Sequence, residues 1–273
     1  MHFICGKYTL NLNRPFVMGI VNVTPDSFSD GGKFASTDLA IAHALQLIGE
    51  GADILDIGGE STRPGAITVS VDEELSRVIP VIQVLSQIST IPISIDTYKP
   101  AVMREAILAG ADIVNDVNAL QENGAMETVA KNNVGVCLMH KQGTPQTMQI
   151  SPHYVDAIFE VKQFLIERLN VALSCGITKD RILLDPGFGF GKRKEHNIAL
   201  LQNLDKLSDL GCPLLVGLSR KSILGTIVGG DEQQRLYAGI AASVISIMKG
   251  AHIVRVHDVK ATVDALKVVH AVQ

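Results

Sequence analysis

The side chains of this sequence that could do chemistry recur at one kind of position, the end of a short apolar run. Eight such runs occur, and nearly every one ends in a polar or charged residue that is followed by Gly or Pro. Carboxylates and amides can bind the polar edge of a ring, and cationic side chains can bind an anionic group. These polar ends are, in chain order, Asn22, Asp56, Asp96, Asn115 with Asp116, His140, Asp185, Ser219 leading to Lys221, and Arg255 with His257.

The eight apolar runs that precede these residues have the length and composition of buried strands. Near-continuous apolar strands are typical of parallel sheets, because helices cover both faces of such a sheet. The carboxyl ends of parallel barrel strands meet at one face, so the polar ends are expected to lie together. The runs occupy residues 16–23, 54–58, 91–96, 113–116, 134–140, 182–185, 214–219 and 253–257.

Segments with helical periodicity separate the runs. Ser70 and Glu73 form a capping-box pattern at the start of one helix, in which Pro80 is expected to bend or restart the chain. Pro100 suits the first turn of the next helix, over residues 101–109. The other helices are predicted at residues 36–50, 125–132, 154–174, 197–210, 234–249 and 259–272.

Strand and helix alternate eight times, which predicts a single α/β domain over residues 1–273, a (β/α)8 TIM barrel. Such a barrel takes about 250 residues, and a hydrophobic fraction of 47% can fill its large core. An open doubly wound sheet also alternates and is the alternative fold. Eight units with so many polar strand ends favour closure. Residues 3–12 are expected to form an N-terminal β-hairpin that caps the barrel floor.

Composition excludes several classes of partner. The net charge of −4 provides no basic surface for nucleic acid, and no apolar stretch approaches the roughly 18 residues that span a bilayer. Residues 1–12 lack the features of a secretory signal, so a cytoplasmic location is expected. The four cysteines are scattered without metal-ligand spacing and are expected to be buried free thiols.

Three loops rich in Gly, Pro and Ser follow the apolar runs, and long loops of this kind often clamp a substrate. They occupy residues 24–33, 58–66 and 141–147. Asp56, just before the second loop, and Glu60, within it, are expected to orient Arg63 or the loop itself. His140 is either a catalytic base or a histidine satisfied by its neighbours. The glycines of GFGFGK (187–192) lack P-loop spacing and are expected to permit a sharp turn.

The motifs at the strand ends resemble those of dihydropteroate synthases, in order and along nearly the whole chain. The motifs of the first two of these loops, and SRKS (219–222), are far more specific than a lone glycine pattern. The matching segments are GIVNVTPDSFSDGG (19–32), DIGGESTRPGA (56–66), ISIDT (93–97), IVNDV (113–117), LMHKQGTPQTM (138–148), ILLDPGFGFGK (182–192), GLSRKS (217–222) and IVRVHDV (253–259).

The resemblance implies a transferase that joins 6-hydroxymethyl-7,8-dihydropterin diphosphate to p-aminobenzoate. The products are 7,8-dihydropteroate, a folate precursor, and diphosphate. It also implies a homodimer and Mg²⁺ bound at Asn22 and bridging the diphosphate. Without the resemblance, Asn22 would be the better fit to a turn residue before Thr-Pro.

A pterin needs a deep slot with matched polar groups. Asp185 can accept from the 2-amino group and the ring NH, and Asn115 can pair with an edge of mixed donors and acceptors. The resemblance adds Asp96, whose negative charge would favour a cation on the pterin, although a helix cap would also explain this residue. It also places three packing residues, which as core residues need no function, beside the pterin: Val117, Met139 and Gly217.

The remaining implied residues divide between the other two parts of the substrates. Arg255 can fork to phosphate or stack on the ring, and His257 joins it with Asn22 at the diphosphate. Lys221 is implied between the pterin and the aminobenzoate, although most lysines are simply exposed. The residues implied around p-aminobenzoate, besides Lys221, are Thr62, Arg63, Pro64, Phe190 and Ser219.

The expected mechanism is dissociative cleavage of the C–O bond, followed by attack of the neutral arylamine. Asp96, Lys221, Arg255 and His257 are the expected catalytic residues, and the first two loops are expected to exclude water. Two rival functions are a pterin-dependent methyltransferase and a non-catalytic pterin-binding protein. The methyltransferase has no evident need for Arg255 and His257 at a diphosphate or for SRKS, and a non-catalytic protein would keep the pterin slot but lose the loop motifs.

Overall fold

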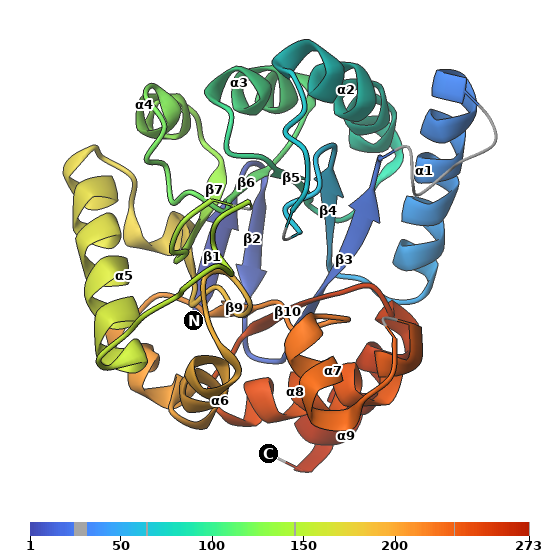
Figure 1. Cartoon of the computed structure of the whole chain (residues 1–273). Coiled ribbons are helices and arrows are strands. Elements are labelled where there is room, and N and C mark those ends of the chain that lie inside the picture. Colours follow the sequence, from blue (N-terminus) through green and yellow to red (C-terminus); the bar gives the residue numbers. More distant parts are fainter. Residues whose placement is uncertain (25–31, 64, 145, 232, 273) are drawn as a thin grey trace.

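The computed structural model describes residues 1–24, 32–63, 65–144, 146–231 and 233–272. Within them, eight parallel strands lie at the centre and helices form a ring around them (Figure 1). The strand order is β8-β7-β6-β5-β4-β3-β10-β9. A parallel bridge between Leu184 and Leu214 joins the two ends of this order, and the Leu184 N–H donates to the Pro213 carbonyl at 3.0 Å. The sheet is therefore closed, which confirms the predicted barrel.

The central strands match the apolar runs closely. Three of them, β4, β6 and β8, have the predicted bounds. The exception is β9, which is much shorter than the run predicted at 214–219. The strands are β3 (Phe16–Asn22), β4 (Ile54–Gly58), β5 (Ile93–Asp96), β6 (Ile113–Asp116), β7 (Gly135–Met139), β8 (Ile182–Asp185), β9 (Leu215–Val216) and β10 (Ile253–Val256).

The helices follow the strands in the predicted alternation. Pro80 lies inside the continuous helix α2 (Val71–Ile88), so the predicted restart there is wrong, and the helix start at Ser70 is confirmed by its bond from the Glu73 N–H at 3.2 Å. The others are α1 (Gly32–Gly49), α3 (Pro100–Ala109), α4 (Ala125–Ala130), α5 (Ala157–Ser174), α6 (Lys194–Gln202), α7 (Ser222–Val228), α8 (Leu236–Met248) and α9 (Val259–Val272).

One predicted helix is divided in the structure. The single helix expected at 197–210 is α6 followed by the 3-10 segment η3 (Leu204–Leu210), with a break at Asn203, whose side chain donates back to the Ala199 carbonyl at 2.8 Å. Further 3-10 turns are η2 (Lys179–Arg181) and η4 (Gln233–Arg235).

The N-terminal hairpin closes the bottom of the barrel, as predicted. Strands β1 (His2–Cys5) and β2 (Tyr8–Asn11) pair antiparallel. Fully buried Phe3 packs with Met18, Ile54 and Leu215, which lie at the starts of their strands. A Cβ on Gly135, the first residue of β7, would lie 2.5 Å from the Phe3 ring, so only glycine allows this approach. The floor is thus a packed apolar plug.

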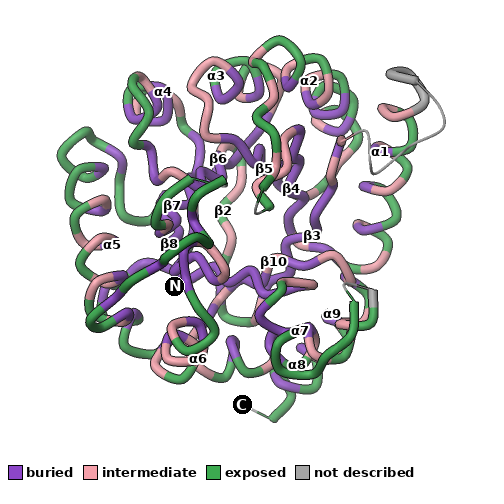
Figure 2. Tube along the Cα trace, in the orientation of Figure 1, coloured by how far each residue is buried: buried purple, intermediate pink, exposed green. Residues whose placement is uncertain are grey.

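The main core lies between the strands and the inner faces of the helices, where the tube in Figure 2 is buried, while the outer helix faces are exposed. Of the four cysteines, Cys5, Cys137 and Cys212 are buried free thiols. Cys175 is exposed, so the prediction of four buried thiols is wrong at this position. It lies at the end of α5, beyond the last residue that faces the core.

Candidate active site

Strand register brings the predicted polar ends into one row. Asn22 is opposite Gly58, Gly58 is opposite Asp96, and Asp96 is opposite Asn115 on four consecutive strands, β3 to β6. Further round, Met139 on β7 is opposite Asp185 on β8. Because the strands are parallel and in this register, side chains far apart in sequence share one end of the barrel.

Arg255 on β10 is the centre of this end. Its Nε donates to Asp56 Oδ2 at 2.5 Å and its Nη2 donates to Asp96 Oδ2 at 2.7 Å. Asn115 Nδ2 donates to the same Asp56 Oδ2 at 3.0 Å. One guanidinium on β10 therefore binds side chains of β4 and β5, two strands that are not its neighbours in the sheet. Asp56 was expected to orient Arg63 or the loop, but the partners that the structure records for it are Arg255 and Asn115.

The two carboxylates beside Arg255 are buried and only partly satisfied. Asp56 is completely buried and Asp96 is 9% exposed. Among the described residues, neither Asp56 Oδ1 nor Asp96 Oδ1 has a hydrogen-bond partner. Burial raises the pKa of Asp96 to about 7, although the Arg255 charge favours its ionised form. Buried acceptors without donors are costly, so this slot is suited to a ligand that carries N–H groups.

Asp185 and Lys221 complete the buried part of the site. Asp185 Oδ1 accepts from the Gly187 N–H at 2.7 Å, and burial raises the pKa of this carboxyl. Lys221 Nζ donates to the Phe188 carbonyl at 2.5 Å and lies 4.7 Å from the centre of the Phe190 ring. Burial lowers the pKa of Lys221 to about 8, against the attraction of Asp185. Lys221 therefore points into the site instead of into solvent.

The glycine-rich segment forms the predicted sharp turn. Gly187 has a φ of 67°, and a Cβ there would lie 1.8 Å from the His140 carbonyl oxygen. Buried Lys192 holds this turn: its Nζ donates to the carbonyls of Gly187 (2.8 Å) and Phe190 (3.1 Å) and contacts His140 Nδ1 at 2.8 Å. Burial and the Lys192 charge lower the pKa of His140 to about 2. His140 is thus the satisfied histidine of the two alternatives.

A second pair of predicted residues meets at the ends of β9 and β10. Ser219 Oγ lies 3.1 Å from His257 Nδ1 and accepts from the His257 N–H at 3.2 Å. Burial, followed by the charges of Arg255 and Arg220, lowers the pKa of His257 to about 3, so the ring is neutral at pH 7. Between Ser219 and Lys221, Arg220 adopts a left-handed φ of 58°.

The Arg220 backbone conformation is rare for a residue with a side chain, and two contacts fasten it. The Arg220 guanidinium pairs with Asp258 at 2.7 Å. Arg235 Nη1 donates to the Arg220 carbonyl at 3.1 Å. The turn lets Ser219 and Lys221 both face the barrel mouth.

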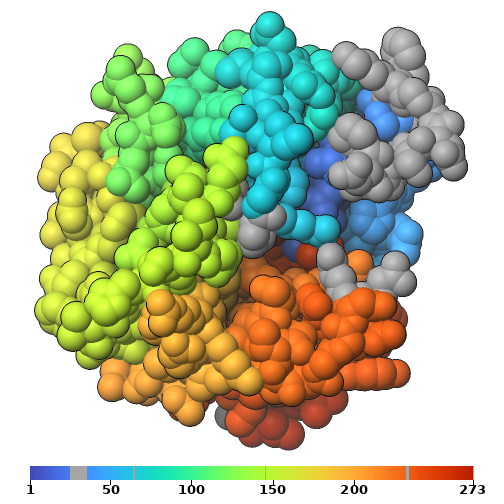
Figure 3. Space-filling view, in the orientation of Figure 1, coloured from blue at the N-terminus to red at the C-terminus, as the bar shows by residue number. Residues whose placement is uncertain are grey.

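Of the residues predicted around p-aminobenzoate, Ser219 is buried, whereas the described ones in the loop after β4 lie nearer the surface. Thr62 is half-buried and Arg63 is exposed, in the loop after β4. Pro64 lies outside the described residues, as does most of the first loop, 25–31. In the space-filling view, the segment after β4 and the segment after β7 extend over the middle of this face (Figure 3).

The predicted packing residues lie beside these groups. Val117 and Met139 are 6% and 4% exposed. Gly217 leaves a gap in which a Cβ would be 3.8 Å from both Arg255 Cβ and Lys221 Nζ. Larger side chains at 217 would therefore enter the space between the two cations.

Sequence reasoning missed the role of two residues of the site: Asp56 was expected to orient Arg63 or the loop, and Lys192 was assigned no role. Asp56 binds both Arg255 and Asn115, and Lys192 holds the turn that carries Phe190. A signal existed for Asp56, because it is a carboxylate inside the apolar run at 54–58, where a charge must be paired. Lys192 gave no such signal, because its partners are mostly backbone carbonyls.

The residues around Asn22 fit a metal that arrives with its substrate. Asn22 Oδ1 and Asp96 Oδ2 each lie 3.8 Å from the position of a Cβ on Gly58. Within the described residues, no group of three or more His, Cys, Asp or Glu side chains could hold a metal. Mg²⁺ commonly takes one or two protein oxygens and completes its shell with water and substrate phosphates.

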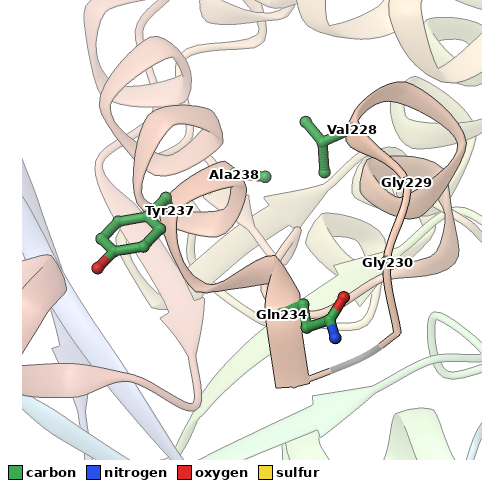
Figure 4. Close-up of a pocket in the computed structure, with 6 residues that line it drawn as sticks. All are labelled: Val228, Gly229, Gly230, Gln234, Tyr237 and Ala238. Carbon is green, nitrogen blue, oxygen red and sulfur yellow. The ribbon is translucent and has the colours of Figure 1, made fainter.

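A separate hollow lies at the outer surface, between the end of α7 and the start of α8 (Figure 4). It is lined by Val228, Gly229, Gly230, Gln234, Tyr237 and Ala238. None of these is a strand-end residue or carries a charge. The hollow is therefore not part of the site at the barrel mouth.

The fold and these residues define a pterin-binding barrel, and comparison with known proteins agrees. The family model described as "Pterin binding enzyme" matches residues 18–257. Among curated proteins, dihydropteroate synthase of Escherichia coli K12 is 52% identical and that of Haemophilus influenzae is 49% identical. The alignments cover 96% and 98% of this chain and 93% and 98% of the relatives. The chain belongs to the pterin-binding enzymes, among the dihydropteroate synthases.

Solved structures support the same placement. A Yersinia pestis dihydropteroate synthase in complex with a sulfonamide drug is 50% identical, with a TM-score of 0.95, and the match covers 100% of this chain and 99% of that one. A Xanthomonas albilineans dihydropteroate synthase with 4-aminobenzoic acid is 52% identical, with a TM-score of 0.95 and coverage of 100% and 98%. In the described part of the chain, no helix is both long and apolar enough to span a membrane.

Proposed function

We propose that this chain, a transferase by its family, condenses 6-hydroxymethyl-7,8-dihydropterin diphosphate with p-aminobenzoate to give 7,8-dihydropteroate and diphosphate. This is the dihydropteroate synthase reaction of folate biosynthesis. The observation that carries the proposal is the buried slot around Arg255, in which Asp56 and Asp96 each keep one acceptor oxygen that has no partner among the described residues. A structure of the Xanthomonas albilineans relative holds 7,8-dihydropteroate.

The pterin would occupy the buried part of the mouth. Asp185 Oδ2 is opposite to the oxygen that the Gly187 N–H already fills, so it can accept from the pterin N–H groups. Asn115 donates one Nδ2 hydrogen to Asp56, so its side-chain carbonyl and its second Nδ2 hydrogen can bind the ring edge. Val117 and Met139 supply the apolar contacts to the ring faces.

The p-aminobenzoate would lie outside the pterin, between the loop after β4 and the turn at 187–191. The Phe190 ring beneath Lys221 supplies an apolar wall. Ser219 offers a hydroxyl and Arg63 offers a positive charge to the carboxylate of p-aminobenzoate. Thr62 lies in the same loop as Arg63. Pro64 stays a prediction for this subsite.

We infer a dissociative mechanism. The C–O bond between the pterin methylene and the diphosphate breaks first, and the electron pair leaves with the diphosphate. Asp96 favours the resulting cation by its charge, and Arg255 and the neutral His257 donate hydrogen bonds to the leaving group. The arylamine nitrogen then forms the new bond to the methylene carbon, and its proton passes to diphosphate or water.

Lys221 acts between the two substrates. A pKa of about 8 leaves it mostly protonated at pH 7, so it can donate to the pterin edge while it flanks the aminobenzoate. Mg²⁺, when bound with the diphosphate, would neutralise part of its charge, and Asn22 Oδ1 would be its side-chain ligand. Calorimetric titration of Mg²⁺ with diphosphate, into wild type and Asn22→Ala, would test that assignment.

The decisive test of the reaction uses purified protein with dihydropterin diphosphate, p-aminobenzoate and Mg²⁺. We expect diphosphate and dihydropteroate to appear together in equal amounts. The rival methyltransferase would transfer a methyl group from a methylated folate instead, and a pterin-binding protein would bind without turnover. Either result in place of paired product formation would overturn the proposal.

We also propose a homodimer through the surface of α7 and α8. Exposed apolar side chains gather there, and Val228 and Tyr237 are 58% and 80% exposed. Light scattering after gel filtration should give twice the chain mass for wild type and half that for Val228→Asp/Tyr237→Lys. A monomeric wild type would refute the dimer. The cytoplasmic location stays a prediction, which cell fractionation would test.

A further inference from the structure

One ammonium group outside the pterin slot connects both ends of the loop after β4. Lys99 Nζ donates to Glu60 Oε2 near the start of this loop and to the Val69 carbonyl near its end, at 2.6 Å. Its third partner is Glu74 Oε2 on α2, at 2.6 Å. An ammonium has three hydrogens, so all three of its donors are used on protein acceptors.

Glu60 strengthens the same connection. Its Oε2 also accepts from the Val69 N–H at 3.3 Å, and its Oε1 accepts from the Tyr98 hydroxyl at 3.3 Å. The two ends of the loop are thus joined directly and through Lys99. On the neighbouring helix, Arg77 Nη1 donates to the Gly59 carbonyl at 2.7 Å.

The cluster is too buried to be an ordinary surface ion pair. The side chains of Lys99, Glu60 and Glu74 are 12%, 6% and 1% exposed. Burial works against the Lys99 charge, but its hydrogen bonds to Glu60 and Glu74 outweigh burial and raise its pKa. A buried pair of this kind is weak evidence for stability by itself, and a positional role explains it better.

The position of Lys99 connects this loop to the catalytic strand ends. It lies three residues after Asp96, at the start of α3, where its N–H donates to Thr97 Oγ1 at 3.2 Å. The loop that it closes carries Thr62 and Arg63. Any movement of the Lys99 anchor therefore moves the aminobenzoate residues relative to the pterin slot.

We propose that Lys99 is a positioning residue that holds Thr62 and Arg63 at the aminobenzoate subsite without touching either substrate. The inference rests on the proposed function, because it assigns a substrate to the loop. It separates the two substrates energetically: loss of Lys99 should impair use of p-aminobenzoate and leave pterin binding intact.

The test compares wild type with Lys99→Met and Glu60→Gln in steady-state kinetics. We expect Lys99→Met to raise KM for p-aminobenzoate by about tenfold, with KM for the pterin diphosphate within about twofold of wild type. Glu60→Gln, which keeps the shape of the anchor and is less prone to misfold, should raise the same KM by about threefold. Lys99→Arg should recover part of the loss.

Lys162→Met is the matched control. The Lys162 ammonium also binds one carboxylate and one carbonyl, Asp209 at 2.6 Å and Lys206 at 2.8 Å. Both partners lie in η3 and not in the loop after β4. Removal of the Lys162 ammonium should leave both KM values unchanged. Loop closure has an activity-independent readout, since thermolysin should cut before exposed Ile67 at least about fivefold faster in Lys99→Met than in Lys162→Met.

Each outcome of this experiment bears on either the proposed function or the role of Lys99. An inactive wild type contradicts the proposed function, whereas the thermolysin comparison would still test the anchor. If wild type is active and both Lys99→Met and Glu60→Gln keep the wild-type KM for p-aminobenzoate, the inference is wrong. Equal losses for both substrates would also overturn it, because they would indicate a general structural role.

Discussion

Two clusters of one cation and two buried carboxylates lie next to each other at the barrel mouth. In the first, Arg255 binds Asp56 and Asp96. In the second, Lys99 binds Glu60 and Glu74. The carboxylates and cation of the first lie on strands, while Glu60, Glu74 and Lys99 lie in the loop and helices that follow β4 and β5.

The clusters differ in what their polar groups have left to offer. The Lys99 ammonium spends all three donors on the protein. Arg255 has five N–H donors, of which two bind Asp56 and Asp96. The same combination of one cation and two carboxylates therefore serves two purposes. The strand cluster is open to a ligand, and the loop cluster is closed upon itself.

The largest effect should come from breaking the strand cluster at its centre. Arg255→Met should lower kcat/KM by at least about 1000-fold, because the leaving diphosphate loses a donor and two buried carboxylates lose their cation. Arg255→Lys should retain more activity, since it keeps the charge without the fork. Steady-state kinetics on protein whose circular dichroism matches wild type would check this, and near-normal turnover would contradict it.

Lys192 extends the comparison to a third buried cation, one that binds carbonyls. Lys192→Met should lower the free energy of unfolding by about 3 kcal/mol, because the buried carbonyls of Gly187 and Phe190 lose their donor. Urea denaturation at pH 8 would measure it, with Lys162→Met as the control. A loss below about 0.5 kcal/mol would show that the turn does not need this lysine.

Asp56 tests whether the strand cluster depends on charge or on shape. Asp56→Asn keeps the shape but replaces a charged acceptor of Arg255 and Asn115 with a neutral one. We expect kcat/KM for the pterin diphosphate to fall about 30-fold, the size of a lost charged hydrogen bond. The KM for p-aminobenzoate should stay within about twofold of wild type. An increase in that KM alone would contradict the assignment of the strand cluster to the pterin.

The smallest effect concerns pH. The pKa of His257 is about 3 in the folded protein, below the unfolded value near 6.5. Between these values the unfolded state binds more protons, so stability is full above pH 6.5 and falls as the pH falls towards 3. His257→Gln should reduce this fall by about 1 kcal/mol per pH unit, somewhat less than the ideal value because the ring is partly exposed. The free energy of unfolding of wild type and His257→Gln would be measured by urea denaturation from pH 7 to pH 5. Parallel curves for the two proteins would refute the prediction.

Local sequence was enough for the strands and for the position of the polar strand ends. Asp96, Asn115 and Asp185 each end a short apolar run, so pattern alone places them at one barrel face. The same reasoning missed α7, whose sequence SILGTIV carries a glycine and β-branched residues that disfavour helix. Tertiary packing, which buries Ile223 and Leu224, overrides that propensity.

The contacts between strand ends and loops could not be predicted in the same way. Lys192 contacts His140 and Lys99 binds Glu74 across long sequence separations, and no periodicity encodes such pairs. Residue type was also misleading, because lysines are mostly exposed. These contacts depend on the register of the closed barrel, which only the three-dimensional structure supplies.

The division between the clusters is that the strand cluster, together with Asp185, binds the pterin, whereas the loop cluster serves only the aminobenzoate. It is tested most directly by calorimetric titration of dihydropterin diphosphate with Mg²⁺, without p-aminobenzoate, into wild type, Asp185→Asn and Lys99→Met. We expect Asp185→Asn to weaken binding by at least about 30-fold and Lys99→Met to stay within about twofold of wild type. Equal weakening in both variants, or a loss confined to Lys99→Met, would contradict it.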